Sequence, residues 1–129
     1  MNADERRLQL DKITETIIGC AFKVHNTLGC GFLEKVYENA LAYELRKAGL
    51  FVEQQVPIDV FYEEQCVGQY CADLRVERSV IVELKTARAF DDAHIAQSIN
   101  YLAATSLTVC LLMNFAKPRL DFKRIVRNF

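Results

Sequence analysis

Apolar side chains recur every three or four residues in three stretches of the chain, and this spacing predicts three amphipathic helices. The first stretch covers about residues 8–28, the second about residues 33–48 and the third residues 91–105. Gly29 and Gly49 directly follow the first two stretches. Glycine is common just after a helix because it adopts the left-handed conformation easily, so both glycines support the predicted C-termini.

Between the second and third helices the pattern changes to a period of two, which is typical of strands. Residues 56–60 alternate apolar and polar side chains, and another strand begins near Cys66 and reaches a turn at residues 77–79. Two apolar runs follow the third helix, at residues 107–114 and 120–126. The resulting order, helix, helix, three strands, helix, two strands, predicts an α/β fold with a central mixed sheet flanked by helices.

The segment of residues 70–88 predicts a hairpin register, because one pairing brings its apolar residues onto a single face. The pairs are Val76 with Val80, Leu74 with Val82, and Ala72 with Leu84. The same register places Asp73 directly opposite Glu83, with Lys85 two residues further along the same face. Like charges opposed across strands are destabilising. Two carboxylates and a lysine are, however, what a divalent-cation site for phosphodiester hydrolysis requires.

The Glu83-x-Lys85 pair has two interpretations. Such a triplet often lies on an ordinary solvated edge of a sheet. Here the strand around it, VIVELKT, is strongly apolar, which favours a central strand with both faces covered. A buried carboxylate pair needs a cation or a proton. A divalent metal is the simplest solution, and hard oxygen ligands suit Mg²⁺ or Mn²⁺ better than zinc.

Two helices carry further candidates. Glu34 lies in the first turn of the second helix, where it either stabilises the helix N-terminus or turns into a site at the edge of the core. His94, Gln97 and Tyr101 share one face of the third helix. That face is either a half-exposed shoulder or a surface that binds a phosphate, since Gln97 and Tyr101 can donate hydrogen bonds. His94 is a candidate general base, although a surface position is the simpler interpretation.

Composition and charge narrow the function classes. With 51% hydrophobic and 26% charged residues, the chain resembles an ordinary globular protein, and its length suits a single domain over residues 1–129. The net charge of −1 argues against non-specific coating of nucleic acid but is compatible with a local basic patch. No segment has the roughly 20 apolar residues of a membrane span, and residues 1–12 contain no apolar signal region. We therefore expect a cytoplasmic protein with no membrane partner.

Basic side chains that could follow a nucleic-acid backbone lie around the predicted hairpin and near the C-terminus. They are Arg75, Arg78, Lys85, Arg88, Lys117, Arg119, Lys123, Arg124 and Arg127. Such a run of charge is more often a solvated face than a binding surface.

The five cysteines do not form a recognisable framework. Their number is odd and no pair has CxxC spacing, which argues against disulfides and a zinc knuckle. Cys20 and Cys110 lie in apolar runs and are predicted to be small core residues. A catalytic pair of a cysteine with His25 or His94 stays open, but no thiol has an activating local sequence.

The segment VHNTLGCGFLEKVYENAL contains Gly31-x-x-Glu34-x-x-Tyr37 and resembles the signature of the small GxxExxY proteins, which belong to the PD-(D/E)XK nuclease-like superfamily. The resemblance covers nearly the whole chain and implies a restriction-endonuclease-like core. It also implies the role of each candidate residue. Glu34, Asp73 and Glu83 would be metal ligands, and Lys85, Gln97 and Tyr101 would be catalytic. One departure is that Ala72 precedes Asp73, where the nominal motif has proline.

Two functions from different classes follow from these residues. The favoured one is a Mg²⁺- or Mn²⁺-dependent phosphodiesterase that acts on nucleic acid, with DNA favoured over RNA. The alternative is a catalytically inactive module that keeps the nuclease fold and binds nucleic acid or protein, either as a homodimer or as a subunit of a complex.

Overall fold

The computed structural model describes residues 1–127 and contains the predicted order of elements. The helices are α1 (Ala3–Leu28), α2 (Glu34–Lys47) and α3 (Asp92–Thr105). The strands are β1 (Val52–Tyr62), β2 (Gln65–Val76), β3 (Val80–Lys85), β4 (Val109–Asn114) and β5 (Asp121–Val126). Among these residues, no helix combines the length and apolar character that crossing a membrane takes.

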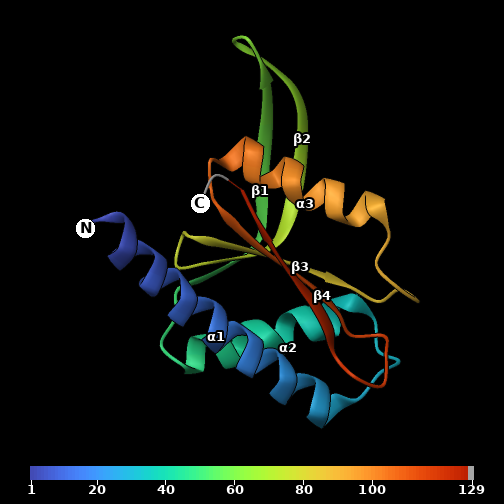
Figure 1. Ribbon diagram of the computed structural model, residues 1–129. Helices are drawn as coiled ribbons and strands as arrows, with labels where there is room; N and C mark the ends of the chain where they lie inside the picture. The colour runs from blue at the N-terminus through green and yellow to red at the C-terminus, as the bar shows by residue number, and fades with distance from the viewer. Residues whose placement is uncertain (128–129) are drawn as a thin grey trace.

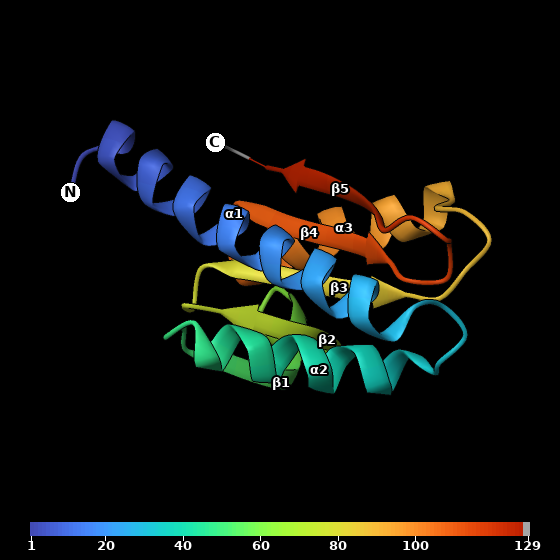
Figure 2. The same ribbon diagram turned by 90° about the horizontal axis from the view of Figure 1, so that it is seen from below.

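The five strands form one mixed sheet in the order β1-β2-β3-β4-β5. Only β3 and β4 are parallel, because α3 connects them and crosses one face of the sheet. The other neighbouring strands are antiparallel. Helices α1 and α2 pack side by side on one face, and α3 lies on the opposite face (Figures 1 and 2). The predicted α/β fold with a central mixed sheet flanked by helices is therefore confirmed.

The helix ends follow from local residues. Asn2 caps α1 by accepting a hydrogen bond from the backbone N–H of Glu5, so α1 begins several residues before the predicted start near Leu8. The extra residues at the start of α1 are mostly polar, so the spacing of apolar side chains could not predict them. Asp91 caps α3 by accepting a hydrogen bond from the backbone N–H of His94, and Gly29 follows α1 with a φ of 70°.

The apolar side chains form one cluster on each face of the sheet. Under α1 and α2 the cluster includes Ile17, Tyr37, Leu41 and the β3 residue Val82. Under α3 a smaller cluster includes Leu102, Cys110 and others. Because neighbouring residues of β3 alternate between the faces, all but the last residue of this strand are buried, and the prediction of a central strand with two covered faces is confirmed.

The β1–β2 hairpin is long and extends past the rest of the sheet, where it forms an arm beside α3 (Figure 1). At its base Val52 packs under α1 and α2, whereas Val56 packs in the cluster under α3. Gln55 lies between them with a φ of 51°, in the left-handed region. This strained residue marks the place where the strand changes the face on which its side chains are buried.

The predicted hairpin register is correct at its closed end and wrong at its open end. Val76 pairs with Val80 and Leu74 with Val82, as expected. The backbone ladder between β2 and β3 then stops, so Ala72 does not pair with Leu84. These two residues belong to different hydrophobic clusters, on opposite faces of the sheet. The apolar pattern alone could not show that β2 and β3 separate at Asp73 and Glu83.

Candidate functional site

The carboxylates of Asp73 and Glu83 lie where β2 and β3 separate, and each replaces a missing ladder contact. Asp73 Oδ2 accepts a hydrogen bond of 2.8 Å from the backbone N–H of Leu84. Glu83 Oε1 accepts one of 2.9 Å from the backbone N–H of Asp73. Each carboxylate thus accepts a hydrogen bond from a backbone N–H group of the opposite strand, and these two bonds bring the side chains together. Simple opposition across a regular ladder, which the sequence predicted, is not how they meet.

This pair carries more negative charge than its surroundings compensate. Burial and, to a smaller extent, the nearby charge of Asp73 together raise the pKa of Glu83 to about 8. Burial also raises the pKa of Asp73, with additional repulsion from Glu38 and Glu34. The backbone N–H donors oppose both shifts but do not overcome them. The site therefore favours a bound proton or a cation.

Lys85 ends β3 beside this pair, and its Nζ lies 3.3 Å from Oε1 of Gln97 on α3. Tyr101, one turn further along α3, is buried and donates a hydrogen bond of 3.4 Å to the carbonyl of Cys71. Burial, together with the charges of Glu83 and Asp73, raises the pKa of Tyr101 to about 12, so the hydroxyl keeps its proton. The structure thus brings Lys85, Gln97 and Tyr101 to the side of the acids that faces α3.

Glu34 approaches from the other helical layer. It is the first residue of α2, is exposed, and accepts a hydrogen bond of 3.3 Å from Thr86, which directly follows Lys85. Together with Asp73 it lines a small cleft of about 190 Å³. Glu34 thus faces Asp73 across the cleft, and as the acidic residue in the first turn of α2 it also suits the positive end of the helix.

Glu38 and Gln55 line the same cleft, and the sequence interpretation missed both. Glu38 is only 3% exposed, and its carboxylate accepts a bond of 2.6 Å from Nε2 of Gln55. The same amide nitrogen lies 3.5 Å from Oδ1 of Asp73. A signal for Glu38 was present, because it lies four residues after Glu34 and three before Leu41 on one helical face. No spacing could have identified Gln55, whose position depends on the bend of β1.

Two buried polar side chains hold the loops that carry the site. Tyr37 donates a hydrogen bond of 2.6 Å to the carbonyl of Gly29 and stacks on Phe115, with ring centroids 4.7 Å apart. It thereby ties down the loop that precedes Glu34. Asn114, opposite Lys85 in β4, bonds both the N–H and the carbonyl of Ala87 and so fixes the start of the loop after β3.

Both histidines have structural partners. His25 is buried, and its Nε2 lies 2.8 Å from the carbonyl of Lys117. His94 belongs to the capping box of α3, where its Nδ1 accepts a bond from the backbone N–H of Asp91. Burial raises the pKa of Cys110 to about 12, which is the opposite of thiol activation. Cys110 is a core residue as predicted, and Cys20 packs partly buried against the core.

The basic side chains are less available than their number suggests. Arg75 forms two hydrogen bonds with Glu53, Arg124 pairs with Asp11, and Lys117 pairs with Asp121. Arg88 is exposed on the loop that follows Lys85. Arg119 and Lys123 of the C-terminal run are exposed as well, so exposed positive charge lies both beside the acids and near the C-terminus.

The donors at the site fit a hard divalent cation, although residues 1–127 contain no group of three His, Cys, Asp or Glu side chains already arranged to hold one. Asp73 and Glu83 supply carboxylate oxygens, and Glu34 and Glu38 face the same cleft. Burial raises the pKa values of both Asp73 and Glu83, and the charge of Lys85 only partly opposes these shifts. A cation could enter once Glu83 and the Gln55 amide change their hydrogen bonds.

Residues 11–125 match the profile of the PD-(D/E)XK nuclease superfamily. No curated protein sequence matches the chain. Two solved structures share the fold with a TM-score of 0.53 and 18% sequence identity: an alkaline exonuclease from Laribacter hongkongensis and the protein SSO0001. The matches cover 73% and 74% of this chain but 56% and 50% of those proteins, so the chain spans little more than half of their length.

Proposed function

The chain belongs to the PD-(D/E)XK nuclease superfamily, and from this we propose that it is a Mg²⁺- or Mn²⁺-dependent nuclease, with DNA favoured over RNA as the substrate. The observation that carries the proposal is that Asp73 and Glu83, both with raised pKa values, lie close together beside the end of β3. Lys85 is the last residue of that strand. The spacing of Gly31, Glu34 and Tyr37 supports the finer assignment to the GxxExxY group.

Each site residue has a role in this proposal. Asp73, Glu83 and Glu34 would hold the ion, which when bound supplies a Lewis acid and lowers the pKa of a coordinated water. Lys85 places its ammonium where negative charge develops on the phosphate during hydrolysis. Gln97 orients this ammonium through the 3.3 Å contact. Tyr101 keeps its hydroxyl proton and would donate a hydrogen bond to a phosphate oxygen in place of the carbonyl of Cys71.

The test is cleavage of a labelled DNA strand by the purified protein in magnesium or manganese. Lys85→Ala and Asp73→Asn should each lower the rate by at least about a hundredfold, as expected when charge stabilisation at the reacting centre is lost. Lys23→Ala is the matched control, because Lys23 pairs with Glu44 on the outer side of α1 and α2. Cleavage that survives in both site variants would show that another protein or another site cuts the strand.

One observation favours the alternative of a non-catalytic module: both carboxylates of the pair already bond backbone N–H groups, and the described residues hold no preformed three-ligand group. Calorimetric titration with manganese separates the two functions. The nuclease requires heat of binding that disappears in Asp73→Asn. A protein that binds no manganese at millimolar concentration, yet still binds nucleic acid or a protein partner, would be such a module.

A further inference from the structure

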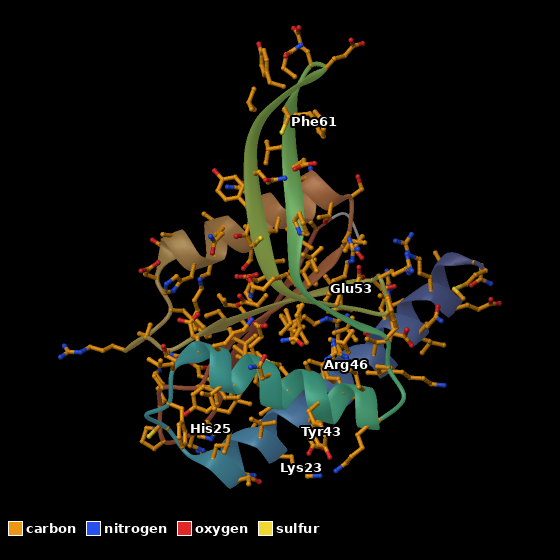
Figure 3. All side chains as sticks on the ribbon, turned by 180° about the vertical axis from the view of Figure 1, so that it is seen from behind. Lys23, His25, Tyr43, Arg46, Glu53 and Phe61 are labelled. Carbon is orange, nitrogen blue, oxygen red and sulfur yellow. The ribbon has the colours of Figure 1, made fainter. Side chains whose placement is uncertain are left out.

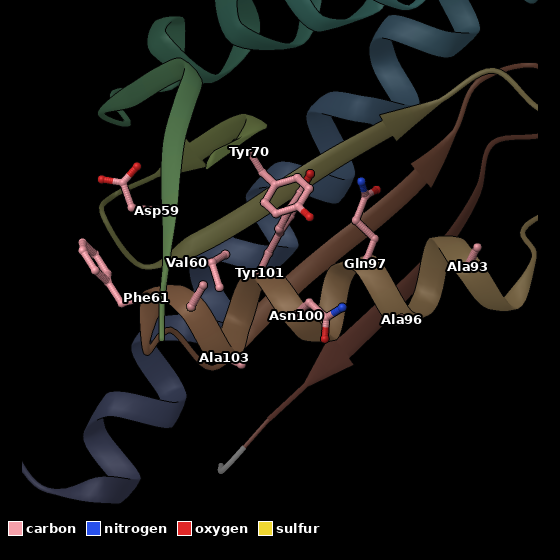
Figure 4. Close-up of a pocket in the computed structure, with 11 residues that line it drawn as sticks. Asp59, Val60, Phe61, Tyr70, Ala93, Ala96, Gln97, Asn100, Tyr101 and Ala103 are labelled. Atoms are coloured by element: carbon pink, nitrogen blue, oxygen red, sulfur yellow. The ribbon is translucent and has the colours of Figure 1, made fainter. Parts of the chain in front are cut away.

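A groove of about 740 Å³ runs between α3 and the arm formed by β1 and β2 (Figure 4). Its floor is a row of small side chains on α3, including Ala93, Ala96 and Ala103. Its opposite side is formed by the arm, which contributes Phe61 and Tyr70. The volume falls within the range of about 300–1,000 Å³ that is usual for sites that bind small molecules.

The aromatic side chains of the arm are exposed, although they line a groove. Phe61 is 60% and Tyr70 51% exposed. The Tyr70 ring stands next to Tyr101, with ring centroids 6.1 Å apart and planes tilted by 53°. Exposed rings above a floor of alanines leave room for another flat ring to stack on them.

The polar lining suits the edge of a base better than a phosphate. Asn100 and Gln97 can each donate and accept hydrogen bonds, and Asp59 can accept them. Asp59 is the one charged residue among the described residues that line the groove, and no lysine or arginine is among them. A phosphate would meet repulsion there, whereas an uncharged base with amino and carbonyl groups would find partners.

The groove is continuous with the candidate site, since Gln97 and Tyr101 belong to both. We propose that the groove binds an unpaired base of the nucleotide next to the scissile phosphate, so that the substrate is a single strand or a frayed end. This deepens the proposed nuclease function and rests on it. A paired base inside a duplex cannot enter the groove until it is unpaired and unstacked, which costs a few kcal/mol.

Binding is measured by fluorescence anisotropy with a short single-stranded DNA oligonucleotide in the presence of EDTA, which prevents cleavage. Tyr70→Ala should raise the Kd about 5- to 100-fold, the range that corresponds to the loss of one base–aromatic stack. Tyr70→Phe keeps the ring and should bind as the parent protein does. Phe61→Ala should weaken binding in the same direction.

Tyr43→Ala is the matched control. Tyr43 is also an exposed aromatic residue, at 63%, but it lies on α2 at the opposite end of the molecule from Phe61 (Figure 3). Its loss should leave the Kd unchanged. Equal weakening by Tyr43→Ala and Tyr70→Ala would overturn the proposal, and so would an unchanged Kd in Tyr70→Ala.

A second probe keeps the phosphates and removes the bases. An oligonucleotide with successive abasic positions should bind the parent protein as weakly as the intact strand binds Tyr70→Ala, and its Kd should not respond to that substitution. If the abasic strand binds as tightly as the intact one, only the backbone is recognised and the proposal fails. If sedimentation instead shows a dimer that Tyr70→Ala dissociates, the arm is an interface between two copies, which also overturns it.

These results can be separated from those that test catalysis. If Lys85→Ala abolishes cleavage while Tyr70→Ala changes neither binding nor cleavage of single strands, the nuclease function stands and the groove proposal falls. If the parent protein cuts nothing but its binding depends on the bases and on Tyr70, the groove proposal stands and the catalytic function falls.

Discussion

The two faces of the sheet differ in how completely helices cover them. In the part of the chain that the structure describes, twenty buried apolar residues form the cluster under α1 and α2, whereas seven form the cluster under α3. A single helix cannot cover an arm that extends past the sheet, so Phe61 and Tyr70 stay exposed and a groove opens beside them. The face under α1 and α2, called the covered face below, contains most of the buried apolar side chains. The face under α3, called the open face, leaves room for a ligand.

The candidate site lies between these two regions. Glu83 and Lys85 alternate along β3 with residues that pack under α1 and α2, and Lys85 bonds Gln97 on α3. Asp73 lies opposite the bend at Gln55, where the hairpin changes faces. Burying two carboxylates costs stability. Apolar burial on the covered face stabilises the fold against this cost, and the open face contains the groove that we propose for the substrate base.

The largest expected effect on stability is the loss of Tyr37, which belongs to the covered face. Its ring is fully buried against Phe115, and its hydroxyl bonds the carbonyl of Gly29. Tyr37→Ala should lower the free energy of unfolding by about 3–5 kcal/mol, as for other large aromatic truncations in a core. Tyr37→Phe should cost about 1–3 kcal/mol, because it removes the hydroxyl that donates to the carbonyl of Gly29 and accepts from the backbone N–H of Phe32. Both are measured by urea denaturation.

The control lies on the open face. Tyr70→Ala removes a ring that is half exposed, so its cost should stay below about 1 kcal/mol. If Tyr70→Ala lowered the free energy of unfolding as much as Tyr37→Ala does, the arm would contribute as much to stability as the covered face, and the contrast between the two faces would be wrong.

Stability should depend on pH because of the acid pair between the two faces. The pKa of Glu83 is raised from near 4.5 to about 8, so the folded protein binds more protons than the unfolded chain between these values. Its contribution to stability is therefore fully present below about pH 4.5 and is lost as the pH rises towards 8. The free energy of unfolding, measured with urea in the presence of EDTA, should fall across this window. Each unit of raised pKa corresponds to about 1.4 kcal/mol.

Glu83→Gln tests the cause of that fall. The amide keeps the shape of the side chain but cannot ionise, so stability should change less with pH than in the parent protein. Manganese should recover stability in the parent near pH 8, because a cation compensates the ionised pair, and should have little effect on the variant. Parallel pH profiles for the two proteins would contradict the assignment of the raised pKa to Glu83.

How far the sequence could predict the fold depended on the periodicity of apolar residues. Regular spacing located α1, α2, α3 and β1, apolar runs located β4 and β5, and the closed end of the β2–β3 hairpin followed from its apolar pairs. The first turn of α1 was missed because it is polar and exposed. The separation of β2 and β3 was missed because bonds from carboxylates to the backbone leave no mark in a pattern of apolar positions.

The site was predictable to a similar degree. The structure places Asp73, Glu83 and Lys85 together, with Gln97 and Tyr101 on one side and Glu34 on the other, and their chemical roles stay a prediction. Glu38 could have been noticed from helical spacing. Gln55 could not, since its contacts depend on a left-handed residue inside a strand, which local sequence favours only for glycine or asparagine.

A smaller effect than that of Tyr37→Ala is expected at this bend, which joins the two faces. Gln55→Ala and Gln55→Gly both remove the amide that bonds Glu38, but only glycine adopts a φ of 51° without strain. Gln55→Gly should therefore be more stable to urea than Gln55→Ala by about 1 kcal/mol. At Asp59, an exposed residue of the same strand without a positive φ, the order should reverse, because glycine weakens an ordinary strand. If alanine were the more stable residue at both positions, the left-handed bend would not be the feature that turns the hairpin from the covered face to the open one.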